Sequence, residues 1–197
     1  MTKGTVLAVT GDVGAGKSTV SRLFEELGGF LIDADRVVAD LWRRPDVIDA
    51  AVERWGGGVL DESGRVVHAR VAKIIFTDRA EYGWTVALLH PRVRKEIERE
   101  IEGRPDTAKG WTVVEIPMLF ESGVAPWVTV KVFVTASRSV RLERCRARGW
   151  NESDLAERES FFMDSERRMA LSDFLIRNEG TPEDLRRAVR EVYDGCN

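Results

Sequence analysis

One nine-residue segment constrains the fold of this chain more than any other feature. Gly11–Thr19 reads G-D-V-G-A-G-K-S-T and fits the pattern G-x-x-x-x-G-K-[S/T] at every fixed position. It follows an apolar run over 6–10 and opens a helical stretch, which is the context such a loop needs to wrap around phosphate groups. Its glycines let the backbone curl so that successive N–H groups point at phosphate oxygens, and the helix N-terminus adds positive potential. We therefore predict a nucleotide phosphate site here.

The side chains that close this loop have separate expected roles. Lys17 should reach the β- and γ-phosphates of the nucleotide, and the Ser18 hydroxyl should ligate Mg²⁺. A guanine-binding switch would need a later Asn-Lys-x-Asp, and a dinucleotide site would need G-x-G-x-x-G; the chain has neither. A small-molecule kinase fits the length of 197 residues. The loop residues predicted to bind ATP are Gly11, Gly14, Ala15, Gly16, Lys17, Ser18 and Thr19.

Short apolar runs alternate with longer helical stretches, which is typical of an α/β fold with a parallel sheet. The predicted strands are Thr5–Val9, Phe30–Asp33, Thr112–Ile116, Thr129–Val134 and Phe174–Ile176. The predicted helices are Lys17–Leu27, Ala34–Trp42, Asp46–Trp55, His68–Phe76, Asp78–Leu89, Pro91–Glu102, Arg138–Arg148, Glu152–Met169 and one that starts at Thr181. The helical excursion over 34–110 is too long for a loop, so we expect an inserted substrate-covering subdomain there.

Acidic residues stand where ligands of open α/β sheets gather, at the carboxyl ends of strands. Asp33 ends the second strand, and its carboxylate can take the proton of an attacking hydroxyl or hold a Mg²⁺-bound water. Asp35, two residues later, either joins this site or only caps the next helix. Glu115, at the end of the third strand, either orients Mg²⁺ through water or is merely a polar residue near a strand end.

Composition excludes several classes of protein. The formal net charge of -3 does not favour a nucleic-acid or membrane-surface protein. Cys145, Cys196, His68 and His90 are too few and too scattered for a zinc site. No apolar run approaches the roughly 20 residues needed to span a bilayer. Because the phosphate loop begins as early as Gly11, we expect no signal peptide. We expect a cytoplasmic protein with reduced thiols.

Several further segments, taken with the phosphate loop, carry a family resemblance. They are Ile32–Asp35 (I-D-A-D), His90-Pro91-x-x-Arg94, the segment from Ile116 to Glu121 (I-P-M-L-F-E), and Ser172-Asp173-x-x-Ile176-x-Asn178. In this order and spacing they resemble the dephospho-CoA kinases over nearly the whole chain. The phosphate loop alone is shared with thousands of NTPases, whereas the other segments together are much more specific.

The resemblance implies a three-layer α/β P-loop NTPase core with a five-stranded parallel sheet, a helical substrate-binding insertion over 34–110 and a helical lid over about 138–168, all within one domain spanning 1–197. It also implies ATP-dependent phosphorylation of the 3′-hydroxyl of dephospho-CoA, the last step of coenzyme A synthesis, with Mg²⁺ accompanying ATP. ATP and dephospho-CoA would be its small-molecule partners, without nucleic acid or membrane. We expect a monomer or a weak homo-oligomer.

By position in the family's motifs, Asp33 is the expected base. The expected acceptor-binding residues are Asp33, Asp35, His90, Arg94 and Glu121, with the Arg94 guanidinium suited to pair with a phosphate. Arg144 and Arg148 match the lid, where Arg148 is expected to act on the transferring phosphate, and Asn178 falls near the adenine of ATP. By itself, an arginine-rich helix such as the one predicted over Arg138–Arg148 is more often a solvated face than a phosphate-binding one. This chain departs from the family at Arg141 and near Phe162, where the family usually has Gln, which puts local lid contacts in doubt.

Overall fold

The computed structural model describes residues 4–104 and 110–196, which form two compact units. Unit 1 comprises Met1–Asp33 and Glu100–Asn197, and unit 2 comprises Ala34–Arg99. No described helix combines the length and apolarity that crossing a membrane requires.

Unit 1 is built on a five-stranded parallel sheet, as predicted, with strand order β2-β3-β1-β4-β5. The strands are β1 (Thr5–Gly11), β2 (Phe30–Asp33), β3 (Trp111–Glu115), β4 (Val130–Thr135) and β5 (Phe174–Arg177). In the central strand β1, four consecutive apolar residues from Val6 to Val9 are fully buried. Such an unalternated apolar run is what a strand covered on both faces requires.

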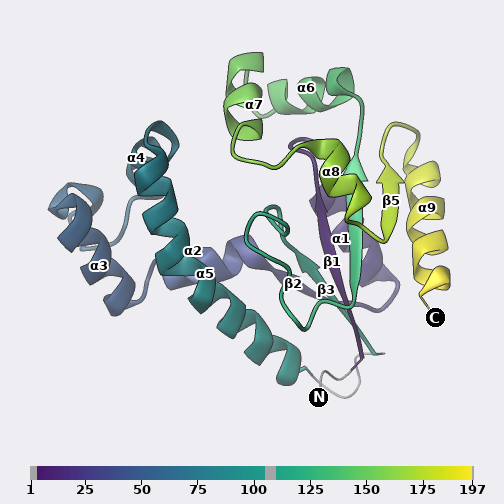
Figure 1. Cartoon of the computed structure of the whole chain (residues 1–197), viewed down its shortest axis with the longest axis horizontal. Helices are drawn as coiled ribbons and strands as arrows, with labels where there is room; N and C mark the ends of the chain where they lie inside the picture. Colours follow the sequence, from purple (N-terminus) through teal and green to yellow (C-terminus); the bar gives the residue numbers. More distant parts are fainter. Residues whose placement is uncertain (1–3, 105–109, 197) are drawn as a thin grey trace. The chain divides into compact units, whose positions relative to one another are not determined.

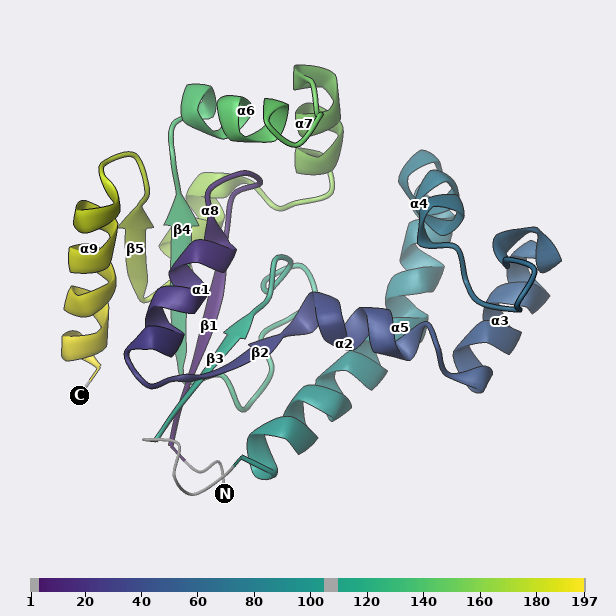
Figure 2. The ribbon, with the colours of Figure 1, turned by 180° about the vertical axis from the view of Figure 1, so that it is seen from behind.

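Helices cover both faces of this sheet (Figures 1 and 2). Helix α1 (Lys17–Glu26) and helix α9 (Pro182–Gly195) lie together on one face, and α8 (Ser165–Ala170) packs against β1 on the other. Val20 and Phe24 of α1 meet Leu185, Val189 and Val192 of α9 in one buried cluster with the strands. The spacing of four and three residues along α9 places its apolar side chains on a single stripe. The three-layer α/β prediction is therefore confirmed.

Unit 2 is helical, with α2 (Ala34–Leu41), α3 (Pro45–Trp55), a short 3-10 turn η1 (Gly57–Val59), α4 (His68–Thr77) and the long α5 (Arg79–Glu102), whose residues through Arg99 belong to it. Aromatic rings join its helices: the centroids of Trp42 and Trp55 are 6.3 Å apart, and those of Trp55 and Trp84 are 4.9 Å apart. The Trp55 indole N–H also donates to Glu81 Oε2 over 2.8 Å. The partly buried indole of Trp55 thus has a partner for its polar N–H.

The predicted break at Pro91 is wrong, because α5 continues through it. Proline cannot donate the backbone bond of its turn and crowds the carbonyl four residues earlier, so it usually ends or kinks a helix. Pro91 leaves the Ala87 carbonyl without its helical donor, and the Arg92 guanidinium binds the neighbouring Leu88 carbonyl over 2.7 Å. The helix therefore continues although one of its backbone hydrogen bonds is missing.

The prediction of one helix over 152–169 is also wrong. The segment forms α7 (Glu152–Glu159) and the separate α8. Asp164 accounts for the second start, because its carboxylate accepts from the backbone N–H of Arg167 over 3.1 Å and so caps α8. The preceding helix α6 (Arg138–Arg146) ends two residues before the predicted Arg148.

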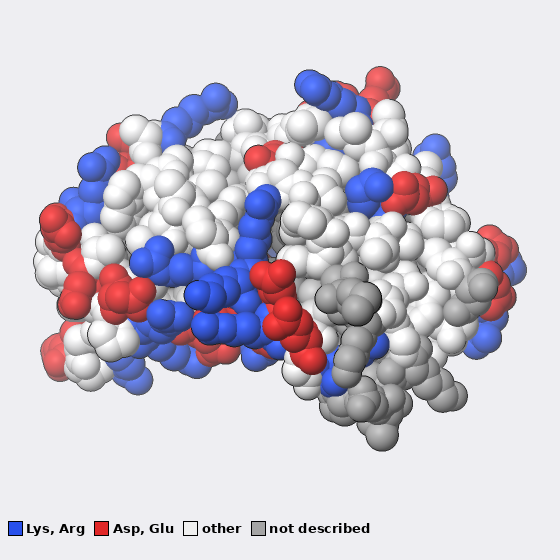
Figure 3. All heavy atoms as spheres, turned by 60° about the horizontal axis from the view of Figure 1, so that its bottom comes forward, with Lys and Arg blue, Asp and Glu red and all other residues white. Residues whose placement is uncertain are grey.

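Charged side chains of unit 2 are largely paired with one another. Arg44 contacts Asp46 at 3.1 Å and Glu96 at 3.3 Å, and Arg92 contacts the other oxygen of Asp46 at 3.3 Å. Figure 3 shows Lys and Arg side chains gathered on one face with acidic side chains beside them. Exposed pairs of this kind contribute little stability each, and here their main effect is to balance local charge.

Helix α9 offers a direct test of how local sequence stabilises unit 1. The Thr181 hydroxyl accepts from the Asp184 N–H, and the Asp184 carboxylate accepts from the Thr181 N–H over 3.0 Å, forming a capping box. We predict that Thr181→Ala lowers the free energy of unfolding by about 1 kcal/mol in urea denaturation, because the cap is lost. Thr181→Ser is the matched control, which keeps the hydroxyl. Equal losses in both variants would contradict the role of the cap.

Candidate active site

The phosphate loop joins β1 to α1 in the predicted position. Gly14 has φ of 78° and Gly16 has φ of 93°, a left-handed conformation that favours glycine. A Cβ on Gly16 would lie 2.4 Å from Asn178 Nδ2, and one on Gly14 would lie 2.9 Å from the Arg141 carbonyl oxygen. The glycines are therefore required both by the turn and by the close approach of β5 and α6.

The loop's carbonyl groups are held by side chains from the C-terminal half of the chain. Asn178 Nδ2 donates to the Ala15 carbonyl over 2.8 Å, and Arg144 Nη1 donates to the same oxygen over 3.1 Å. Arg141 Nη1 donates to the Val13 carbonyl over 3.2 Å. Because a peptide's N–H and C=O point in opposite directions, holding these carbonyls on the protein side favours amides that face an anion.

Lys17, the first residue of α1, folds back onto its own loop. Its ammonium donates to the Asp12 carbonyl over 3.0 Å and to the Gly11 carbonyl over 3.3 Å. These contacts keep the charge beside the loop backbone, where a phosphate chain is expected.

Three predicted oxygen-bearing side chains lie at the carboxyl edge of the sheet. Asp33 pairs in register with Glu115 on the adjacent strand, and Glu115 pairs in register with Val9 of β1. Glu115 Oε1 accepts from the Ser18 hydroxyl over 3.0 Å. The parallel sheet thus brings together the end of β2, the end of β3 and the start of α1.

The oxygen atoms around Ser18 fit a magnesium ion that is bound together with a nucleotide. No group of three or more His, Cys, Asp or Glu side chains suited to a metal occurs in the described part of the chain. Magnesium bound with nucleotide needs only one or two protein oxygens, because phosphates and waters complete its octahedron. The hydroxyl of Ser18 and the carboxylate of Glu115 supply such hard oxygen atoms.

The remaining predicted residues of unit 1 have different surroundings. Glu121 Oε1 accepts from the Met163 N–H over 2.7 Å, and Glu121 Oε2 has no hydrogen-bond partner among the described residues. Arg148 is exposed in the turn after α6, with its backbone N–H donating to the Cys145 carbonyl over 2.9 Å. Arg144, one turn earlier, also donates to the Asn178 carbonyl over 2.9 Å.

Asp35, His90 and Arg94 belong to unit 2. Asp35 lies in the first turn of α2, while His90 and Arg94 are one turn apart on α5. Partial burial lowers the pKa of the His90 imidazole, and the nearby positive charge of Arg94 lowers this pKa further. His90 is therefore neutral at neutral pH.

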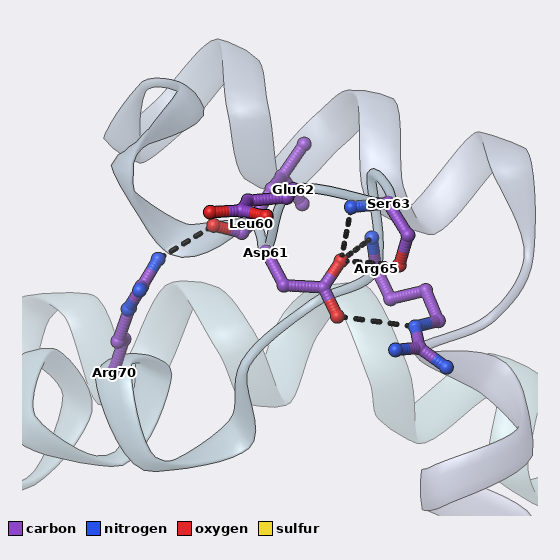
Figure 4. A pocket seen from close by; sticks show the side chains of 6 residues that line it. All are labelled: Leu60, Asp61, Glu62, Ser63, Arg65 and Arg70. Atoms are coloured by element: carbon purple, nitrogen blue, oxygen red, sulfur yellow. Dashed lines mark hydrogen bonds and ion pairs between the residues drawn. The ribbon is translucent and has the colours of Figure 1, made fainter.

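Unit 2 also carries a surface hollow that the sequence did not indicate (Figure 4). Asp61 is its centre: the carboxylate accepts from the Ser63 hydroxyl over 2.7 Å and from the Arg65 backbone N–H over 3.0 Å. These hydrogen bonds hold the pKa of Asp61 well below its usual range. The carboxylate is already bound within its own turn, so the hollow adds no group to the site described here.

A buried ion pair beside the phosphate loop was missed in the sequence. Arg168 of α8 contacts Asp12 with a nitrogen–oxygen distance of 2.8 Å, and their side chains are 5% and 7% exposed. Asp12 occupies a variable position of the loop motif, and Arg168 lies in an acidic and basic stretch that looks solvent-exposed. No local signal distinguishes the two from surface residues. Arg141, noted as a departure from the family, is also largely buried and pairs with Glu159.

Comparison with known proteins decides the family. The family model described as dephospho-CoA kinase matches residues 5–184. The chain belongs to the dephospho-CoA kinase family. This confirms the resemblance seen in the sequence.

Individual dephospho-CoA kinases match over similar lengths. The enzyme of Streptomyces avermitilis is 34% identical over 189 residues, covering 95% of this chain and 91% of that one. The enzyme of Aquifex aeolicus is 30% identical over 189 residues, covering 95% of both chains. A crystal structure described as TT1252 from Thermus thermophilus is 27% identical, with a TM-score of 0.81 over 98% of each chain. The family match therefore extends across both units.

The environment of His90 gives a prediction for pH titration. Because the folded pKa lies below the ordinary value of about 6.5, the unfolded chain binds more protons as pH falls through that value, and His90 then opposes folding. We predict that NMR titration of His90 gives a midpoint below this value and that Arg94→Gln raises it. An unchanged midpoint in Arg94→Gln would contradict the contribution of the Arg94 charge.

Proposed function

We propose that this chain transfers the γ-phosphoryl group of ATP to the ribose 3′-hydroxyl of dephospho-CoA, forming coenzyme A and ADP. The observation that carries this proposal is the carboxyl edge of the sheet, where Asp33, Glu115 and Ser18 lie beside the phosphate loop in a member of this family. The loop binds the donor phosphates, and Asp33 faces the acceptor hydroxyl. In the cell, we place this reaction in the cytoplasm.

The loop and the residues that brace it form the ATP site in this proposal. The backbone amides from Gly14 to Thr19 donate hydrogen bonds to the phosphates. The ammonium of Lys17 leaves the loop carbonyls and binds the β- and γ-phosphates. Asn178 and Arg144 both donate to the Ala15 carbonyl, and we place the adenine of ATP on this side of the loop. Ser18 would hold the Mg²⁺ that accompanies ATP and Glu115 would orient it through water, and the ion would supply positive charge to neutralise the phosphates.

Asp33 is the residue that we assign to the acceptor hydroxyl. Its carboxylate takes the hydroxyl proton as the oxygen attacks the γ-phosphorus in line with the departing ADP oxygen. The phosphoryl transition state needs little covalent help, so fixed positions and charges supply most of the rate enhancement. Lys17 stabilises the charge on the transferring group.

The acceptor and the lid involve residues outside the loop. We propose that the helical insertion binds dephospho-CoA through Asp35, His90 and Arg94. Glu121, on unit 1, is a further residue that we assign to acceptor binding. The Arg94 guanidinium suits the acceptor's phosphate because its planar fork matches phosphate oxygens. Arg148 is exposed after α6 and is free to close over the phosphates as part of a lid over about 138–168. The enzyme is expected to work as a monomer or weak homo-oligomer.

An ADP-release assay with single acceptors tests the proposed reaction. We predict turnover with dephospho-CoA and none with AMP, shikimate or a nucleoside, and NMR of the product should show the new phosphate on the 3′ oxygen. Lys17→Ala should lower turnover by about 10³-fold or more, because it removes a charge from the transferring group. Lys73→Ala, an exposed change on α4, is the control. Turnover of AMP without turnover of dephospho-CoA would overturn the assignment.

The role of Asp33 gives a second test. We predict that Asp33→Asn lowers kcat by about 10²–10⁴-fold while the Kd for ATP changes little, because the amide cannot accept the proton. Asp40→Asn, which alters an exposed carboxylate of α2, serves as the matched control. If Asp33→Asn instead weakens only ATP binding, Asp33 is a metal or structural residue rather than the base.

A further inference from the structure

The buried pair of Asp12 and Arg168 links the phosphate loop to helix α8. Asp12 Oδ1 accepts from Arg168 Nη2 over 2.8 Å and from the Ser165 hydroxyl over 2.9 Å. Its other oxygen, Oδ2, accepts from the Thr135 hydroxyl over 2.6 Å. Both carboxylate oxygens are therefore bound by the protein, which holds the first variable side chain of the loop against α8 and the end of β4.

Arg168 makes more contacts than its pair with Asp12, among them a 4.0 Å ion pair of its Nε with Glu121 Oε1. Its Nη1 donates to the Gly11 carbonyl over 3.2 Å, and its Nε donates to the Met163 carbonyl over 2.9 Å. The guanidinium carbon is 5.1 Å from the ring centroid of Phe133 and 5.0 Å from that of Phe162. A planar fork held this way has its orientation fixed, in contrast with a flexible ammonium.

The Gly11 carbonyl is the point where Arg168 and Lys17 meet. It accepts from Lys17 Nζ over 3.3 Å and from Arg168 Nη1 over 3.2 Å. When Lys17 turns to the phosphates, it must release this carbonyl. A buried carbonyl without a donor is costly, so a second donor already in place lowers the cost of that movement.

We propose that Arg168 is a positioning residue for ATP. It keeps the Gly11 carbonyl bound when Lys17 leaves it for the nucleotide, and Asp12 is the counter-charge that fixes the guanidinium for this task. This inference rests on the proposed function only in taking ATP as the ligand of the loop. Arg168 acts through the loop and Lys17 and is not expected to touch the phosphates.

A purely structural ion pair gives a different expectation. Such a pair would stabilise the fold, and its loss would lower the melting temperature without altering how ATP binding depends on Lys17. If Arg168 keeps the Gly11 carbonyl bound when Lys17 leaves it, the two residues are energetically coupled in ATP binding. The free-energy cost of an unbound carbonyl arises only when neither residue donates to Gly11. A double-mutant cycle measures this coupling directly.

The test uses Arg168→Lys, which keeps the buried charge opposite Asp12 but loses the fork that spans two carbonyls. With titration calorimetry of Mg·ATP and no acceptor, we predict that Arg168→Lys weakens ATP binding roughly tenfold in the wild-type background. In a Lys17→Met background, where no ammonium has to leave Gly11, the same change should weaken ATP binding less than about threefold. Arg167→Lys, an exposed change on the same helix, is the matched control.

A second variant covers the case in which the lysine is not tolerated. The double change Asp12→Asn with Arg168→Gln removes both charges of the Asp12–Arg168 pair and replaces the fork by a shorter amide, although Glu121 also loses its 4.0 Å ion pair with Arg168. It should show the same dependence on Lys17. An equal loss of ATP affinity in both Lys17 backgrounds, or a lowered melting temperature with unchanged ATP affinity, would overturn the proposal. Normal ATP binding by an enzyme that ignores dephospho-CoA would instead contradict the proposed reaction and leave this test intact.

Discussion

The conformation of the phosphate loop depends on how its carbonyl groups are bound. A loop that aims its amides at an anion must turn its carbonyls toward the protein, where each buried oxygen needs a donor. Arg141, Arg144 and Asn178 supply these donors from α6 and the end of β5. Leaving one such group unpaired costs about 1–3 kcal/mol, so the loop and the C-terminal half of the chain stabilise each other.

The parallel sheet has a comparable effect on the acidic residues. Asp33 and Glu115 are far apart in the sequence, yet parallel pairing of β2 with β3 makes them direct neighbours. Their meeting follows from strand direction alone, because the carboxyl ends of parallel strands share one edge. The hydroxyl of Ser18 reaches the same edge because α1 starts where β1 ends. One topological rule therefore brings Asp33, the proposed base, to the same edge as Glu115, Ser18 and the phosphate loop.

The sequence predicted those parts of the molecule that depend on short-range signals. The five strands, the loop and the start of α9 at Thr181 follow from apolar runs, glycines and a capping box. The helix through Pro91 could not be predicted, because proline usually interrupts a helix and no nearby residue indicates that this helix continues. The pair of Asp12 and Arg168 was missed because its burial depends on tertiary packing. The packing of α8 against β1 buries both charges, and no sequence signal near either residue indicates this burial.

The arginines after β4 show why composition and spacing alone cannot assign their roles. Arg141, Arg144 and Arg148 share one helical face by their spacing, and that face suits a phosphate-binding lid equally well for all three. In the folded chain, Arg141 and Arg144 each bind carbonyls of the phosphate loop, whereas Arg148 lies exposed beyond the end of α6. A guanidinium has five N–H donors, so the two bonds of Arg144 to carbonyls do not exhaust its capacity for a nucleotide. The same residue type thus supports the loop at two positions and lies exposed at a third.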